Sequence, residues 1–185
     1  MSRLEPLDVE SLDPADRHII ESIVGTRKGG LVGPFSVLAY NPRVAVTADA
    51  LHNSFRLEGK LDRRLFELMV SAIAREFGAP YAWQVHARLA RKAGLDTAII
   101  ENLLAQTKPE SLQEDERLIY ELTVDLLRNR SLTPDNYARG KDVLGVELLV
   151  EVVAAVGFYS MLCLVLNAFD VKAVDGFRFE APEYS

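Results

Sequence analysis

A histidine stands in the middle of an apolar helical stripe in the segment "PYAWQVHARLARKAGL", residues 80–95. At 100° per residue, His86 shares one face with Trp83 and Leu89, whereas Arg88 and Arg91 fall on the other face. An imidazole that points inward is costly to bury unless it is paired, and imidazole is well suited to exchanging a proton near neutral pH. His86 is therefore a candidate general acid and base, with a purely structural core histidine as the alternative.

A candidate carboxylate partner for His86 occurs 19 residues earlier, at Glu67. Two antiparallel helices joined by the turn "EFGAP", residues 76–80, would bring these two positions to similar heights. On its own helical wheel, however, Glu67 lies at the edge of the apolar face beside Val70 and Ser71, which favours a solvated side chain. Glu67 is thus a candidate orienting partner of His86, with a surface glutamate as the alternative.

The elements that would position these residues are all helical. Apolar residues recur at helical spacing, no segment alternates with the period of a strand, and caps and prolines mark the starts. The fold class expected is all-α, with about eight helices and short connections. The expected helices are 14–27, 43–59, 62–77, 80–93, 97–106, 111–130, 133–145 and 146–169, and 31–42 is expected to be a loop with a short apolar turn.

Composition restricts the class of partner. Lys and Arg total 21 against 27 for Asp and Glu, and the basic residues are scattered, which disfavours nucleic acid or an anionic membrane as a partner. The single cysteine, Cys163, has no partner for a disulfide or a dithiol motif. The acidic start "MSRLEPLDVESLDPADR" lacks the apolar centre of a signal peptide, so a cytoplasmic location is expected.

The segment 152–169 contains 18 residues without a formal charge. It is flanked by Glu151 and Asp170 and interrupted by Gly157 and Asn167. We interpret this segment as the central or interface helix of a helical protein rather than as a membrane span. Its apolar surface exceeds what one small bundle covers, which favours a homo-oligomer.

The sequence lacks the motifs of several common catalytic and binding sites. The sequence contains no GxSxG elbow, no phosphate-binding loop ending in Lys and Ser or Thr, and no GxGxxG after a strand. Its three histidines form no HxxxH or HExxH pair, so no metal site is expected.

The segment "LFELMVSAIAREFGAPYAWQVHARLARKAGLD", residues 65–96, resembles the core of the carboxymuconolactone decarboxylase family, which includes the alkylhydroperoxidase D-like proteins. The shared features are a Glu in the first helix, a turn of small residues, a Tyr-x-Trp-x-x-His helix and a closing Ala-Gly-Leu. The flanks "LVGPFSVLAYNPRVA" and "VGFYSMLCLVLNAFDV" also resemble longer members. The resemblance implies an AhpD-like helical bundle that assembles as a trimer or hexamer, with a domain at 30–172, an N-terminal helical extension at 1–29 and a tail at 173–185.

The resemblance also suggests which branch of the family applies. The peroxidase branch carries CxxC one turn before the histidine, and the corresponding positions here are Ala79 and Ala82, which disfavours dithiol chemistry. The decarboxylase branch removes CO2 from 4-carboxymuconolactone without a cofactor. The resemblance therefore implies a carboxy-lyase acting on a small cyclic or unsaturated carboxylate in aromatic-compound breakdown, with His86 as general acid and base and Glu67 as its orienting partner.

Other residues and other functions stay open. Trp83 and Tyr159 are candidates for contacting the substrate, with core packing as the alternative for Trp83. Arg43, Arg56 and Arg88 are candidates for binding a substrate carboxylate, and the sequence does not choose among them. An isomerisation or a lactone hydrolysis by the same Glu and His is an alternative reaction. The alternative functions are a non-catalytic helical oligomer that binds a small acid and a peroxidase that lacks the CxxC motif.

Overall fold

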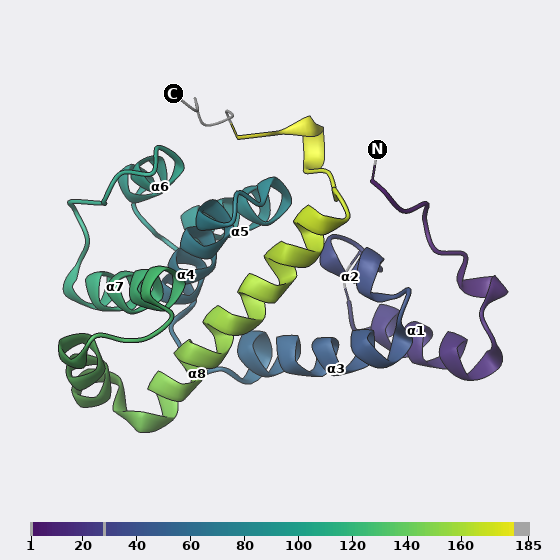
Figure 1. Cartoon of the computed structure of the whole chain (residues 1–185), viewed down its shortest axis with the longest axis horizontal. Helices are drawn as coiled ribbons and strands as arrows, with labels where there is room; N and C mark the ends of the chain where they lie inside the picture. The colour runs from purple at the N-terminus through teal and green to yellow at the C-terminus, as the bar shows by residue number, and fades with distance from the viewer. Residues whose placement is uncertain (1, 28, 180–185) are drawn as a thin grey trace.

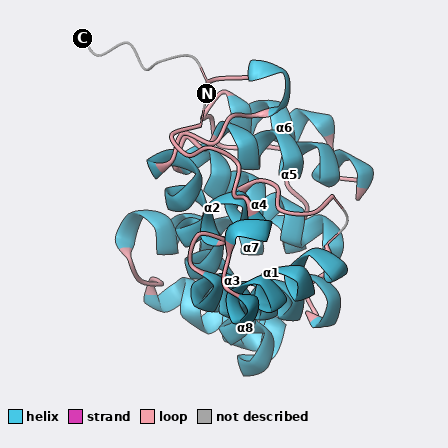
Figure 2. Ribbon diagram, turned by 90° about the vertical axis from the view of Figure 1, so that its right-hand side faces the viewer, coloured by secondary structure: helices cyan, strands magenta, loops and turns pink. Residues whose placement is uncertain are grey.

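The described part of the chain is helical throughout. The computed structural model describes residues 2–27 and 29–179, and none of these residues forms a strand (Figures 1 and 2). The all-α prediction with about eight helices is confirmed. The α-helices of the described residues are α1 (Pro14–Thr26), α2 (Pro34–Leu38), α3 (Pro42–Asn53), α4 (Arg63–Glu76), α5 (Pro80–Lys92), α6 (Thr97–Leu104), α7 (Glu114–Asn129) and α8 (Pro134–Ala168).

Local sequence signals fix where most of these helices begin. A proline stands at the start of α1, α2, α3, α5 and α8, where its missing N–H costs nothing. Carboxylate caps mark other starts: Asp62 accepts from the backbone N–H groups of Arg64 and Leu65, and Asp96 accepts from that of Ala98.

Helix α4 is the centre of the bundle. All ten residues from 65 to 74 are buried, because α4 is in contact with α5, α6, α7 and α8. A helix covered on several sides has no solvated face, so its polar residues also lie in the interior. This is why the environment of Glu67 differs from what its helical wheel suggests.

A tight turn joins α4 to α5 and sets their antiparallel pairing. Gly78 has φ of 54°, a left-handed conformation that glycine adopts without a Cβ clash. The backbone N–H of Ala79 donates to the carbonyl of Ala74 at 2.8 Å, closing the end of α4. The short connection holds α4 and α5 side by side, which positions Glu67 opposite His86.

Helix α8 runs diagonally across the molecule in Figure 1, with α4, α5 and α7 on one side and α1, α2 and α3 on the other. It contains a break at Gly145, where φ is 73°, so that a first segment ends there and a long apolar segment follows. The two helices predicted at 133–145 and 146–169 correspond to these segments. By length and composition alone, α8 is also apolar enough to cross a membrane.

Two local features differ from the expectations. The stretch predicted as a loop with a short apolar turn contains the short helix α2, whose Phe35, Val37 and Leu38 are buried. Beyond α3 the chain continues as a π-helical turn, η2 (Ser54–Glu58), before Gly59. Such π turns shift the register of side chains and occur often at functional sites.

Both ends of the described chain pack against the bundle. Helix α1 contacts α3 and contributes Ile20 and Ile23 to the common core. After α8, the ring of Phe179 lies 6.0 Å from that of Trp83 and 4.3 Å from the guanidinium carbon of Arg75. The part of the predicted tail from 180 to 185 lies outside the described residues.

Candidate active site

Glu67 and His86 are in direct contact. Oε2 of Glu67 lies 2.7 Å from Nδ1 of His86, within hydrogen-bond distance. Glu67 has no exposed surface, and the side chain of His86 is 12% exposed. The helix pair therefore brings together the two residues that the sequence nominated, in a buried, charge-assisted contact.

The burial of Glu67 corrects the expectation from its helical wheel, which favoured a solvated side chain. A buried carboxylate needs a compensating charge or hydrogen bonds. Arg63, one turn earlier on α4, places Nη2 2.5 Å from Oε1 of Glu67. Arg63 and His86 thus occupy the two oxygens of the same carboxylate.

The contact with Glu67 determines how His86 is oriented. With Nδ1–H donating to the carboxylate, Nε2 on the opposite side of the ring is the nitrogen left to face a ligand. No hydrogen bond to Nε2 is found within the described part of the chain. The ring of Tyr159 stands edge-on to that of His86, with centroids 5.7 Å apart and planes at 88°.

His86 borders a cavity of about 590 Å³ between α1, α2, α3, η2, α5 and α8. That volume suits a small organic molecule. The polar lining comes from two histidines, three arginines, two tyrosines, Thr26 and Asn53, and the apolar lining from residues such as Val32, Phe35, Leu57, Val85, Leu162 and Leu166. The arginines are Arg27, Arg56 and Arg88, the histidines His52 and His86, and the tyrosines Tyr81 and Tyr159.

Tyr159 lines this cavity and is 3% exposed. Its hydroxyl is buried without a hydrogen-bond partner among the described residues. Burial raises the pKa of the Tyr159 phenol well above its ordinary value, so the group stays protonated at neutral pH. A protonated, unpartnered hydroxyl beside His86 is available as a donor to a ligand oxygen.

Trp83 does not line the cavity. It is buried in the core, and its ring packs against Phe179 of the C-terminal segment. Its placement therefore supports the packing interpretation of Trp83 rather than a contact with substrate.

The three arginines considered from the sequence have different locations. Arg56 and Arg88 border the cavity, although the wheel of α5 placed Arg88 on the outward face. Arg43 instead borders a separate groove between α3 and α8. Long arginine side chains reach around a helix, so a wheel position alone does not exclude a contact.

Arg27 is a cavity residue that the sequence reasoning missed. Its Nη1 lies 2.6 Å from Oδ1 of Asp49, and its guanidinium lies 3.5 Å from the centre of the Phe35 ring. The amide of Asn53 donates to the same aspartate at 3.0 Å. Asp49 therefore fixes the position of Arg27 from behind the cavity wall.

His52 is the second residue missed. It is 8% exposed, lines the cavity, and its Nδ1 is buried without a hydrogen-bond partner among the described residues. Burial, followed by the charges of Arg27 and Arg56, lowers the pKa of His52 to about 3. The sequence did contain a signal, because Ala45, Ala48 and His52 share one buried face of α3, as His86 shares one on α5.

The single cysteine, Cys163, lies in the core and also borders the cavity. Cys163 is buried, and burial raises the pKa of its thiol to about 12. Very little thiolate therefore forms at neutral pH, and the thiolate is the nucleophilic form. Ala79 and Ala82, at the positions of the peroxidase motif, are themselves buried. Within residues 2–27 and 29–179, no cluster of three His, Cys, Asp or Glu side chains is arranged to hold a metal ion.

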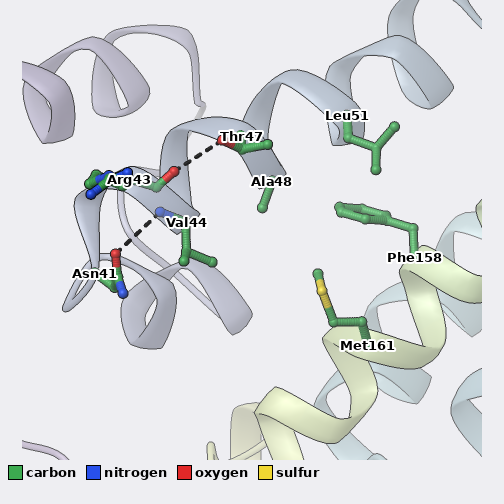
Figure 3. A pocket seen from close by; sticks show the side chains of 8 residues that line it. All are labelled: Asn41, Arg43, Val44, Thr47, Ala48, Leu51, Phe158 and Met161. Carbon is green, nitrogen blue, oxygen red and sulfur yellow. Dashed lines mark hydrogen bonds between the residues drawn. The ribbon is translucent and has the colours of Figure 1, made fainter.

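A second hollow of about 580 Å³ lies between α3 and α8. Figure 3 shows Val44, Ala48 and Leu51 on α3 facing Phe158 and Met161 on α8 across it. This groove is mostly apolar, and none of its lining residues is a histidine, a tyrosine or an acid.

Comparison with known proteins identifies the segment that contains both Glu67 and His86. Residues 44–119 match the family model described as the carboxymuconolactone decarboxylase family. Over this segment the chain is similar to members of that family. His52 and Arg56 lie within this matched segment. Arg27 and Tyr159 also line the cavity but lie outside the matched segment.

The fold is AhpD-like. A solved structure described as an alkylhydroperoxidase AhpD core, an uncharacterized peroxidase-related protein from Ralstonia eutropha JMP134, superimposes with a TM-score of 0.76 at 15% identity. The match covers 94% of this chain and 93% of that one, so the similarity of fold includes the N-terminal helix. No curated protein matches the chain.

Proposed function

We propose that this protein is a cofactor-free carboxy-lyase resembling carboxymuconolactone decarboxylase, acting on a small cyclic or unsaturated carboxylate in aromatic-compound breakdown. One observation carries the proposal: His86 is held through Nδ1 by the buried Glu67 and borders a cavity that has apolar walls and cationic groups. This arrangement suits the transfer of one proton to or from a bound acid.

In the proposed reaction the bond between the ring carbon and the carboxylate breaks and CO2 leaves. The electron pair of that bond moves through the adjacent double bond onto the lactone carbonyl oxygen, giving an enolate. The enolate carbon is then protonated from Nε2 of the His86 imidazolium, and solvent restores that proton before the next turnover. The substrate is its own electron sink, so the proposal requires no cofactor.

Tyr159 is proposed to stabilise the enolate oxygen. Its buried hydroxyl stays protonated because burial raises its pKa, and it has no partner in the described structure. A hydrogen bond that strengthens as negative charge develops lowers the barrier of the chemical step.

Glu67 is proposed as the positioning residue. Its hydrogen bond to Nδ1 fixes the ring of His86 and stabilises the imidazolium form. Arg63 balances the charge of the carboxylate while His86 is neutral.

An ultraviolet assay with 4-carboxymuconolactone tests the proposal. Purified protein should consume the substrate and release one CO2 per turnover, and His86→Gln should lose at least about 100-fold of that rate. His18→Gln is the matched control, because His18 is an exposed histidine on α1 outside the cavity. An unchanged rate in His86→Gln would rule out the assigned role.

The products separate the remaining enzymatic alternatives. Loss of the substrate absorbance without CO2 release would indicate isomerisation or lactone hydrolysis by the same pair. Binding of small acids with no turnover would indicate the non-catalytic oligomer. A peroxidase is disfavoured by the buried Cys163 and by Ala79 and Ala82 at the positions of the two thiols.

We also propose that the protein is a cytoplasmic homo-oligomer, a trimer or hexamer, that buries one face of α8 against a second copy. Exposed apolar residues follow this helix at steps of three and four, at Val146, Val150, Val153, Met161 and Leu164, with exposed Gly157 between them. A stripe of this period fits the matching stripe of another helix. We favour a second copy over a membrane as the partner of this stripe, because Glu147 and Glu151 lie within the same apolar segment.

A further inference from the structure

The cavity beside His86 has a charge that opposes that of the whole chain. The chain carries 27 acidic and 21 basic side chains, yet among residues 2–27 and 29–179 three arginines and no aspartate or glutamate line the cavity. Glu67 and Asp49 lie behind His86 and Arg27 and are not part of the lining. An anionic ligand entering this cavity therefore meets cationic groups and no like charge.

The three arginines differ in how far their charge is already compensated. Arg27 is paired with Asp49 at 2.6 Å. Arg56 and Arg88 border the cavity without an ion pair to any side chain in the described ranges. An uncompensated guanidinium has all of its donors available for a carboxylate, which it binds in a planar, two-point geometry.

Arg56 lies at the end of the cavity that contains His52. It lies four residues after His52, on the π turn that follows α3. Its charge, after that of Arg27, lowers the pKa of His52, and it has the largest electrostatic influence on the pKa of Tyr159. Arg88 is exposed like Arg56 and lies on α5, the helix that carries His86.

His52 adds a neutral donor at the same end. It is more than nine-tenths buried in the cavity wall, and its Nδ1 has no partner among the described residues. A neutral imidazole carries one N–H and donates a hydrogen bond without adding a charge. A buried polar group left unpaired is unfavourable, and a ligand oxygen would relieve that cost.

We infer that Arg56 and His52 together form the carboxylate-binding end of this cavity, which anchors an acid with an apolar body so that its reacting carbon faces His86. This inference rests on the proposed function. In that reaction the anchored carboxylate is the one retained in the product, because an ion pair to the departing carboxylate would stabilise the ground state and slow its loss. The substrate class is therefore an acid with a second, reactive carboxylate directed at the apolar wall.

Equilibrium binding of benzoate and of its neutral analogue benzamide, measured by calorimetry, tests the inference without requiring turnover. Wild-type protein should bind benzoate at least about 10-fold more tightly than benzamide, and Arg56→Met should remove that preference while leaving benzamide binding unchanged. His52→Phe, which keeps the ring and removes the donor, should weaken benzoate binding by about 5-fold. Arg91→Met is the control, because Arg91 is an exposed arginine on α5 outside the cavity.

Three outcomes would overturn the inference: no binding of benzoate, no preference for benzoate over benzamide, or an unchanged preference in Arg56→Met. Arg56 is exposed, so its replacement should leave the fold intact, and a thermal melt checks this for both variants. Arg56-dependent benzoate binding without decarboxylation would retain the anion site and reject the carboxy-lyase. Decarboxylation that depends on His86 but not on Arg56 would retain the carboxy-lyase and reject the anion site.

Discussion

The two hollows of this molecule have almost the same volume, about 590 Å³ and 580 Å³, and opposite chemistry. Helices α3 and α8 border both hollows. On α3, His52 lines the cavity and its neighbour Leu51 lines the groove, and on α8 Tyr159 and Phe158 are divided in the same way. Consecutive residues on a helix point about 100° apart, so two helices can present a polar face to one space and an apolar face to the other.

This difference shows that volume alone does not identify a ligand site. In the part of the chain that the structure describes, the cavity contains buried polar atoms without partners and cationic groups without acids in the wall. The groove offers apolar side chains, which form interfaces between proteins when they lie together on a surface. We therefore propose that proton transfer takes place in the cavity and that assembly uses the groove and the adjoining stripe of α8.

The largest effect should come from Glu67→Gln. The amide keeps the size of the side chain but no longer stabilises the imidazolium, so kcat for the decarboxylation should fall by about 100-fold or more. Steady-state kinetics with 4-carboxymuconolactone measure this change. Glu101→Gln, at an exposed position on α6, should retain the wild-type rate. Equal rates for the two variants would remove Glu67 from the mechanism.

Cys163 should be almost inert although it borders the cavity. Its thiol pKa of about 12 leaves little thiolate, so a disulfide reagent at pH 8 should react about 100-fold more slowly with native protein than with urea-unfolded protein. Absorbance of the released thiolate follows the reaction. A fast native reaction would show that the cavity wall opens, and would reinstate a thiol mechanism for testing with Cys163→Ala.

Acid should destabilise the protein through His52. The charged groups around it are Arg27 on α1, Arg56 on η2 and His86 on α5, with Tyr159 on α8 against its ring. Its pKa falls from 6.5 in the unfolded chain to about 3 in the fold, so the unfolded state takes up the proton first as the pH drops below 6.5. The stability it contributes is complete above that pH and is lost progressively down to about pH 3.

Between pH 7 and pH 5, this single group should cost about 2 kcal/mol of unfolding free energy. Urea unfolding of wild-type protein and of His52→Phe at the two pH values gives the unfolding free energy of each. The cost is the difference between the two proteins in the slope of this free energy against pH. Parallel slopes would mean that His52 binds the same number of protons in the native and unfolded states, which would contradict its lowered pKa.

Met161→Lys should act on the groove and leave the chemistry of the cavity unchanged. Placing a charge in the α8 stripe should reduce the mass measured by light scattering by at least about half. Leu104→Lys, at an exposed leucine on α6 outside the stripe, should leave the mass as in wild-type protein. An unchanged mass in Met161→Lys would move the interface elsewhere or show that the chain is a monomer.

The sequence predicted the helices well because residues close to each helix start determine where the helix begins. Asp13, Asp62 and Asp96 cap α1, α4 and α6, and Gly78 forms the turn that pairs Glu67 with His86. These signals depend on backbone hydrogen bonds within a few residues, which is why one sequence is enough to read them.

The features missed depend on contacts between distant elements. A helical wheel assumes one solvated side, and α4 is covered on several, so the burial of Glu67 was not visible. Arg27 and His52 join the cavity only because α1 and α3 pack together beside α8. The π turn that carries Arg56 has no local sequence signal of comparable strength.

Chemical rescue of His86→Ala tests the central claim most directly. The account predicts that the variant loses decarboxylation of 4-carboxymuconolactone and that added imidazole restores it in proportion to its concentration, because free imidazole fills the space of the deleted ring next to Glu67. Rescue should be absent in Glu67→Gln, where the ring is still present. A His86→Ala protein that turned over at the wild-type rate, or that stayed folded and inactive at every imidazole concentration, would contradict proton transfer by His86.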